Sequence, residues 1–139
     1  MPLPRGFYPK YGHVLLCDFE RGFVHPEMVK RRQVVVISPT STNYRRLCTV
    51  VPISATPPQI QERWHCLIDE TELPWADDEI EHWAKCDMMY TVSFDRLDKF
   101  HRKTRRGGRE YFVPQLTDQE MVNIALSVNS YLDLVEIET

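Results

Sequence analysis

The sequence lacks a hydrophobic run long enough to cross a membrane. In its 139 residues no segment approaches the roughly 18 consecutive apolar residues that a transmembrane helix needs. Residues 1–11 contain three prolines and no apolar core, so we expect no secretory signal and a cytoplasmic location. With 42% hydrophobic and 27% charged residues, the chain is typical of a globular protein rather than a disordered one. Its length predicts a single domain over residues 1–139.

Closely spaced cysteine pairs are also missing. The four cysteines contain no Cys-x-x-Cys pair, and zinc sites usually begin with such a pair, so a zinc site is the less favoured interpretation. Three of the cysteines lie in strand-like apolar runs, where a free thiol packs as a small hydrophobic group. We therefore predict buried, reduced thiols at Cys17, Cys48, Cys66 and Cys86.

Positive charge is not in excess, because the formal net charge is −3. The two signs are nevertheless separated along the chain: residues 69–82 hold seven acids and no Lys or Arg, while residues 96–109 hold seven cations and one acid. A charge run is most often a solvated surface. Local charge density, however, sets the field that a phosphate group experiences. The composition is therefore compatible with an RNA partner without requiring one.

Short apolar runs separated by turn-forming residues predict a β-rich fold. Pro52 cannot donate to a strand ladder, so the strand end near it is expected at an edge or a bulge. A short helix could begin at Pro74, although it would have no clear apolar face. Together the runs predict a mainly β fold, a small and strongly curved sheet or barrel followed by one helix. The predicted strands are 12–19, 33–38, 47–53, 63–68 and 86–97, with an extended piece at 109–114.

The end of the chain predicts a helix over 118–134. Thr117 and Glu120 have the spacing of a capping box, in which each side chain caps a backbone amide of the first turn. Apolar residues then recur at helical spacing, which favours packing against a sheet; an interface with a partner is the less favoured alternative. The predicted apolar stripe consists of Met121, Ala125, Val128 and Leu132, with Ile124 and Tyr131 beside it.

Familiar catalytic motifs are absent: there is no Gly-x-Ser-x-Gly elbow, no Gly-rich phosphate loop before a helix and no His-Glu-x-x-His. The acids at 77–81 are better explained as solvated partners of a helix N-terminus than as an acid/base pair. What remains is the segment "KRRQVVVIS", which places Lys30, Arg31 and Arg32 at the mouth of a buried strand. Glu27 precedes this segment, and a later strand ends in "VVPIS" at Ser54.

The order and spacing of these residues resemble the MazF/PemK family of type II toxin–antitoxin ribonucleases. The matching elements are Gly12-His13, "VLLC" and Asp18-Phe19, then Glu27, Arg32 five residues later before "VVVIS", and "VVPIS" ending at Ser54. The match covers about residues 11–56 well and the rest loosely. Gln33 replaces the family's proline after the arginine, His25-Pro26 replaces small residues before the glutamate, and Ser54 replaces the commoner threonine. An N-terminal arm (1–11), an acidic insertion (57–85) and a basic arm (98–110) surround the match.

This resemblance implies an SH3-like small barrel, usually homodimeric, that cuts single-stranded RNA by attack of the substrate's own 2′-hydroxyl. The implied catalytic residues are Arg32, Ser54 and Glu27. Arg32 can hold phosphoryl oxygens as charge develops, and the Ser54 hydroxyl can fix the scissile group. Glu27 or His25 could accept the 2′-proton, His25 being better matched to neutral pH. The attacking group belongs to the substrate, so we expect no metal and no cofactor, and DNA should survive.

Each of these residues also has a plainer interpretation. Arg32 could cap strand carbonyls or pair with Glu27, which could serve only to orient it. Ser54 could be a turn hydroxyl, and His25 is more readily explained as a surface loop residue. The arginine and the serine must point into a common anion pocket if the ribonuclease hypothesis is correct.

The predicted RNA-binding surface combines the strand mouth with the basic arm, where aromatic residues (Tyr90, Phe94, Phe100, Tyr111) are available to stack on unpaired bases. A merely solvated hairpin is the alternative for the arm. The predicted partners are single-stranded mRNA, a second copy of the chain, and an antitoxin whose acidic segment covers the basic groove. A non-catalytic binding protein of the same fold, or a gyrase poison of the CcdB kind, is the rival hypothesis. The predicted RNA-binding residues are His25, Lys30, Arg31, Arg96, Lys99, Arg102, Lys103, Arg105 and Arg106.

Overall fold

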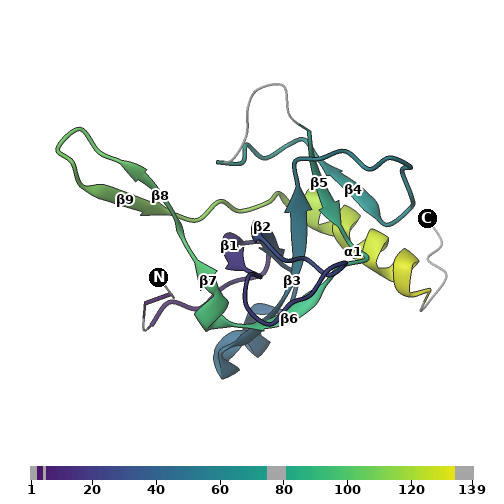
Figure 1. Cartoon of the computed structure of the whole chain (residues 1–139), viewed down its shortest axis with the longest axis horizontal. Helices are drawn as coiled ribbons and strands as arrows, with labels where there is room; N and C mark the ends of the chain where they lie inside the picture. The colour runs from purple at the N-terminus through teal and green to yellow at the C-terminus, as the bar shows by residue number, and fades with distance from the viewer. Residues whose placement is uncertain (1–2, 5, 75–80, 134–139) are drawn as a thin grey trace.

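A strongly curved antiparallel sheet forms the body of the protein, and one C-terminal helix packs against it (Figure 1). The computed structural model describes residues 3, 4, 6–74 and 81–133. Within them, the predicted mainly β fold with a C-terminal helix is confirmed. The elements are β1 (Val14–Asp18), β2 (Arg31–Val36), η1 (Thr40–Arg45), β3 (Leu47–Ser54), β4 (His65–Ile68), β5 (His82–Lys85), β6 (Tyr90–Ser93), η2 (Phe94–Arg96), β7 (Leu97–Asp98), β8 (Phe100–Lys103), β9 (Arg109–Phe112) and α1 (Asp118–Leu132).

The strand order of the main sheet is β4-β5-β3-β2-β1-β7, with β6 also paired to β3. Alternate residues of the central strands enter two separate hydrophobic clusters, one on each face of the sheet, as the period of two requires. In β2, for example, Val35 belongs to the cluster under α1, whereas Val34 and Val36 belong to the opposite one. The predicted burial of this strand is thus confirmed, and it occurs on both faces, which makes the register of the whole sheet specific.

Strand β3 is the hub of the sheet, and Pro52 lies within it. One edge of β3 pairs with β2 along its second half, including Pro52 opposite Val34. The other edge pairs first with β6, through Leu47 to Val50, and then with β5, through Ile53 and Ser54. The prediction of an edge or bulge near Pro52 is therefore right only locally: β3 is central, but its proline occupies the interval between two partner strands, where an amide donor is not needed.

Two strand predictions need correction. Residues 86–97 do not form one continuous strand: Cys86 and Asp87 lie in a turn, and the residues after it are divided among β6, η2 and β7. Strand β5 was not predicted at all, because four residues after an acidic stretch show no alternation. Strands β4 and β5 place two short parts of the predicted acidic insertion, 65–68 and 82–85, in the main sheet. The possible helix after Pro74 falls largely on residues 75–80, outside the described residues.

Helix α1 begins as predicted, with both halves of the capping box formed by Thr117 and Glu120. Its buried face differs from the predicted stripe: Met121 and Ile124 are buried, but Ala125 and Leu132 are exposed. Glu120 is buried because its carboxylate also accepts hydrogen bonds from the backbone amides of Glu70 and Thr71. The helix therefore faces the β4 side of the sheet, and part of its apolar surface remains uncovered.

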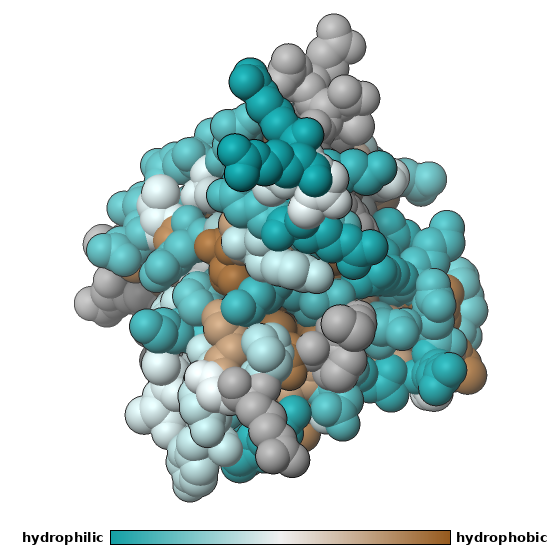
Figure 2. All heavy atoms as spheres, turned by 90° about the vertical axis from the view of Figure 1, so that its left-hand side faces the viewer, coloured by the Kyte–Doolittle hydropathy of each residue, from teal (hydrophilic) through white to brown (hydrophobic). Residues whose placement is uncertain are grey.

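The predicted basic arm forms a two-stranded hairpin, β8–β9, that projects from the body at the left of Figure 1. Gly107 lies in the connecting turn with φ +78°, a conformation that favours glycine. Figure 2 views the molecule from this side and shows a mainly hydrophilic surface with smaller hydrophobic patches.

All four cysteines are buried and free, as predicted. Burial raises the pKa of the Cys17, Cys48 and Cys86 thiols to about 12 and also raises that of Cys66. No helix among the described residues has the length and apolar character of a membrane span.

Candidate functional site

Arg32 and Ser54, far apart in sequence, become neighbours through the pairing of β2 with β3. Gln33 pairs with Ile53 in this ladder, so the next position along each strand sets Arg32 beside Ser54. Directly opposed residues of adjacent strands point to the same side of a sheet. The arginine and the serine therefore lie on one face, as the predicted anion pocket requires.

The Arg32 side chain is half-buried at the start of β2. Its Nε is buried and has no hydrogen-bond partner among the described residues. In this part of the chain no hydrogen bond or ion pair joins Arg32 to Glu27 or to a strand carbonyl. No described contact therefore supports the two plainer interpretations, in which Arg32 caps strand carbonyls or pairs with Glu27. Its guanidinium retains hydrogen-bonding capacity for a ligand.

Ser54 is buried at the end of β3, with 7% of its surface exposed. Its hydroxyl accepts a hydrogen bond from the Thr56 amide at 3.1 Å and lies 3.4 Å from the Thr56 carbonyl oxygen. The hydroxyl thus stabilises the turn that follows, as the plainer interpretation expects. Because its contact to the carbonyl is long, the same hydroxyl can turn its hydrogen toward an acceptor above the sheet.

A residue that the sequence analysis missed completes this row. Trp83 of β5 pairs directly with Ser54, so the three side chains occupy consecutive strands at one level of the sheet. Trp83 is buried, and its indole Nε1 also lacks a hydrogen-bond partner among the described residues. No local pattern could have predicted this, because β5 itself carries no strand signal.

The loop between β1 and β2 carries the two candidate proton acceptors, Glu27 and His25, both exposed. The Glu27 carboxylate accepts a hydrogen bond from the Val24 amide at 2.9 Å, closing a tight turn. The loop is held to the body where the Tyr90 hydroxyl accepts from the Met28 amide at 3.2 Å. The structure therefore gives Glu27 a role in shaping the loop, and no described contact brings either candidate to Arg32.

Two of the predicted RNA-binding cations are engaged inside the protein. Arg31 forms an ion pair with Asp98 at 3.3 Å. Arg96 donates to the carbonyl oxygens of Asp18 and Arg21, at 3.1 and 2.8 Å, and its guanidinium lies 4.7 Å from the centre of the Phe23 ring. Both arginines line a groove of about 270 Å³ that also contains four carboxylates, so their charge is locally compensated. Arg96 holds the β1–β2 loop, a structural role that the sequence analysis did not predict.

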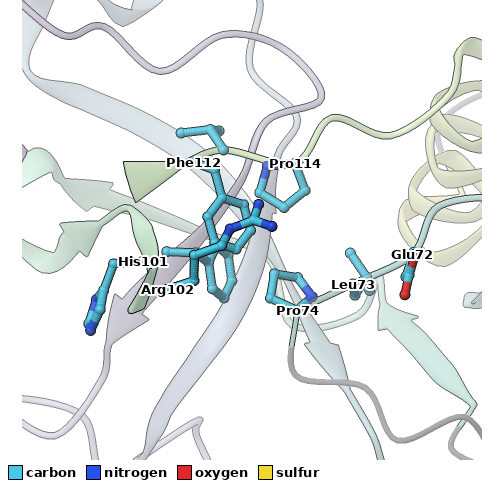
Figure 3. A pocket seen from close by; sticks show the side chains of 9 residues that line it. Glu72, Leu73, Pro74, His101, Arg102, Phe112 and Pro114 are labelled. Atoms are coloured by element: carbon cyan, nitrogen blue, oxygen red, sulfur yellow. The ribbon is translucent and has the colours of Figure 1, made fainter. Parts of the chain in front are cut away.

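The hairpin divides the remaining cations between two faces. On one face Arg102 lies 4.2 Å from the Phe112 ring centre and 4.0 Å from the Glu110 carboxylate. It lines a pocket of about 550 Å³ between the hairpin and residues 72–74; Figure 3 shows Arg102 across the Phe112 ring, with Pro74 and Leu73 beyond it and His101 pointing away. Lys99 lies 4.2 Å from the Phe7 ring centre.

The other face of the hairpin pairs His101 with Tyr111 and Lys103 with Arg109. Two cations directly opposite each other destabilise a strand pair unless an anion lies between them. Arg105 and Arg106 add two more exposed cations at the tip. This face therefore keeps Tyr111 exposed beside the cations, whereas Phe94 and Phe100, which were predicted to be available for stacking, are buried in the core. In the described segments, no three His, Cys, Asp or Glu side chains are grouped as metal ligands.

The fold and the row of Arg32, Ser54 and Trp83 define a small curved-sheet protein with hydrogen-bond donors on adjacent strands at one level of the sheet. The chain belongs to the family of PemK-like, MazF-like toxins of type II toxin–antitoxin systems, whose family model matches residues 10–131. This confirms the resemblance on which the site was predicted.

Two relatives from sequence comparison extend over most of the chain. The uncharacterized protein YifN of Escherichia coli (strain K12) is 32% identical over 128 residues, which cover 78% of this chain and 83% of YifN. An uncharacterized protein of Haemophilus influenzae is 30% identical over 141 residues, covering 90% of this chain and 94% of that protein.

Solved structures share the fold at lower identity. An endoribonuclease from a mycobacterial species superposes with a TM-score of 0.63 at 16% identity and covers 94% of this chain and 97% of its own. MazF from Deinococcus radiodurans superposes with a TM-score of 0.64 at 16% identity, and the match covers 92% of this chain and 99% of MazF. A mycobacterial endoribonuclease in complex with its cognate antitoxin superposes with a TM-score of 0.63 at 17% identity, and the match covers 93% of this chain and 99% of the endoribonuclease. At these identities the likeness establishes the shared fold, including the curved sheet and the C-terminal helix.

Proposed function

We propose that this protein is the toxin of a type II toxin–antitoxin pair and that it cleaves single-stranded RNA. Family membership supports the toxin assignment. The observation that carries the proposed chemistry is the position of Arg32 beside Ser54 on one face of the sheet, with the arginine Nε unpaired among the described residues. A rigid sheet holds such a pair in register better than a loop could.

In the proposed reaction the RNA 2′-oxygen attacks the adjacent phosphorus, and the bond to the 5′-oxygen of the next nucleotide breaks, leaving a cyclic phosphate. The Arg32 guanidinium stabilises the negative charge that accumulates on the phosphoryl oxygens. The Ser54 hydroxyl donates to a nonbridging oxygen and positions the phosphate. The attacking group belongs to the substrate, so the reaction needs neither a metal nor another cofactor.

We assign proton acceptance to the β1–β2 loop, where His25 and Glu27 are both exposed. His25→Ala and Glu27→Gln separate the two residues by the pH dependence of cleavage. If His25 is the base, His25→Ala removes the acidic limb of the pH–rate profile and Glu27→Gln retains it. If Glu27 is the base, the acidic limb is instead retained in His25→Ala and removed in Glu27→Gln.

The RNA strand is proposed to reach the hairpin face formed by Lys103, Arg109 and Tyr111. This proposal is supported by the pairing of two cations across β8 and β9, with an aromatic ring beside them. Lys30 and Lys99 remain proposed contacts, whereas the contribution of Arg31, Arg96 and Arg102 is reduced by their contacts within the protein.

We further propose two protein partners, a cognate antitoxin and a second copy of the chain. An antitoxin with an acidic segment fits the exposed cations of the hairpin. The uncovered apolar surface of α1 supports the homodimer: Val122, Ala125 and Leu132 are exposed, and Ala125 lines a groove of about 220 Å³. Sedimentation of the purified protein, compared with Val122→Glu, tests the second proposal, because a buried glutamate would weaken a dimer held by this face.

The deciding experiment is cleavage of a mixed-sequence RNA with EDTA present. Arg32→Ala and Ser54→Ala should each lower the rate by roughly 100-fold or more, since loss of one preorganised donor to a developing anion has about this effect. Arg45→Ala removes an exposed arginine remote from the row and serves as the matched control. Single-stranded DNA of the same sequence should remain intact.

Equal cutting by the wild type and Arg32→Ala would contradict the assignment of the site. If the wild type does not cut RNA but binds a topoisomerase or another protein tightly, the rival hypothesis of a non-catalytic binder or gyrase poison replaces the ribonuclease proposal.

A further inference from the structure

The indole N–H of Trp83 is a buried hydrogen-bond donor without an acceptor. Trp83 exposes only 7% of its surface, and its Nε1 has no hydrogen-bond partner among the described residues. A tryptophan indole can donate but cannot accept, and a buried tryptophan usually finds a partner for this group. Such an exception calls for a ligand that supplies the missing acceptor.

The position of Trp83 indicates where that acceptor would lie. Trp83 pairs with Ser54, whose other neighbour is Arg32, so unpaired donors flank the serine on both sides. Two strand spacings of about 4.8 Å separate the tryptophan and arginine backbones, roughly 10 Å in all. Both side chains are long enough to reach toward Ser54 from the two ends of the row, so a phosphodiester group bound above Ser54 would lie between them.

Among the described residues, no acceptor is bonded to either of these two donors. The nearest buried and unpaired acceptor along β2 is Gln33 Oε1, but Gln33 is the next residue after Arg32 and its side chain points to the opposite face. It pairs with Ile53, which belongs to the cluster under α1. The two donors that lack partners among the described residues lie on the same face as the Ser54 hydroxyl, and together these groups are suited to bind an anion.

We propose that the Trp83 indole N–H donates a hydrogen bond to a nonbridging oxygen of the RNA phosphodiester held by Arg32 and Ser54. This inference rests on the proposed function and adds a third donor, from a third strand, to its site. The indole transfers no proton. It binds the phosphoryl oxygen and fixes the orientation of the phosphate relative to the guanidinium, and its bond strengthens as negative charge grows on that oxygen.

Trp83→Phe tests the donor while keeping an aromatic ring of similar size. We expect cleavage of the mixed-sequence RNA to fall on the order of 100-fold, the effect of removing one donor to a developing oxyanion. Trp64→Phe is the matched control, because Trp64 packs against Tyr131 of α1 on another part of the molecule and should leave cleavage unchanged. Circular dichroism and a thermal melt establish that both variants fold.

A phosphorothioate substrate distinguishes a hydrogen bond from a packing effect. Sulfur accepts hydrogen bonds poorly, so in the wild type one of the two diastereomers should be cut more slowly than the other. In Trp83→Phe that difference should shrink, since the donor that senses the oxygen is gone. If Trp83→Phe retains the wild-type rate, or is slow but retains the full diastereomer difference, the proposal is overturned.

Nuclear magnetic resonance of the wild type gives an independent readout. The ¹⁵N-labelled indole signal of Trp83 is followed during titration with a 2′-O-methyl oligonucleotide. It is assigned by its absence in Trp83→Phe or, should that variant not fold, by elimination with Trp64→Phe and Trp75→Phe, since the chain has three tryptophans. A downfield shift at saturation supports the proposal, and an unmoved signal refutes it. Failure of the wild type to cut RNA would refute the ribonuclease proposal alone, because the titration still reports whether Trp83 binds a phosphodiester.

Discussion

The hairpin offers the sharpest quantitative prediction, because its exposed cations can be removed without disturbing the core. Lys103 and Arg109 face each other across β8 and β9, and Arg105 and Arg106 lie at the tip. Among the described residues no ion pair involves any of these four side chains. Changing all four to Gln therefore removes charge that is available to phosphate groups and leaves the Phe100–Phe112 contact at the hairpin base in place.

The magnitude follows from counterion release. Each phosphate contact on a single strand contributes about 0.7 to the slope of log K against log salt concentration, so four contacts contribute about 2.8. Between about 50 and 200 mM salt, the wild type should lose roughly 50-fold more affinity than the four-fold variant. The double variant at Arg105 and Arg106 should lower the slope by about half as much, roughly 1.4.

Fluorescence anisotropy with a labelled 2′-O-methyl RNA measures these slopes without cleavage. A variant with Arg45→Gln and Arg63→Gln removes two exposed cations elsewhere on the surface and should keep the wild-type slope. If the four-fold hairpin variant also keeps the wild-type slope, the hairpin does not contact the RNA backbone, and the simpler interpretation of a solvated hairpin is correct.

Two further predictions concern stability and the thiols. Burial alone would raise the pKa of Glu120, but hydrogen bonds from Thr71, Thr117 and Glu70 outweigh it and lower the pKa from its ordinary value of 4.5. Glu120→Gln should therefore cost roughly 1–3 kcal/mol of unfolding free energy at pH 7. Urea titrations at several pH values measure the difference in unfolding free energy between the wild type and Glu120→Gln. This difference should shrink as the pH falls below about 4.5, toward the lowered native pKa. A difference that does not change with pH would contradict the prediction. The four buried thiols, whose pKa is raised, should resist Ellman's reagent at pH 8 until urea unfolds the protein, and rapid native labelling would refute their burial.

Several features of this protein could be predicted from neighbouring residues. A strand was predicted over 12–19, and its alternate residues Leu15, Cys17 and Phe19 all belong to one hydrophobic cluster. The spacing of Thr117 and Glu120 predicted a capping box, which forms. The motif order of Arg32 and Ser54 predicted the family, which the family model confirms. These successes share a cause: strand alternation, capping and motif spacing depend on residues close together in the chain.

Other features were decided only when the chain folded. Ala125 and Leu132 satisfy helical periodicity yet are exposed, because the sheet covers only one part of the helix. Arg31 and Arg96 are cationic in the sequence, but Asp98 and the carbonyls of residues 18 and 21 engage them in the structure. In both cases the sequence identifies a side chain's chemistry without identifying its neighbour.

The row of Arg32, Ser54 and Trp83 shows most clearly which features follow from the sequence and which depend on the tertiary structure. The sequence by itself determined that Arg32 opens a buried strand and that Ser54 ends another. Only the tertiary structure decided that β5 forms, that it pairs with the end of β3, and that Trp83 therefore lies beside Ser54. Register between distant strands is fixed by burial of two opposite faces at once, a property of the assembled sheet that no single segment contains.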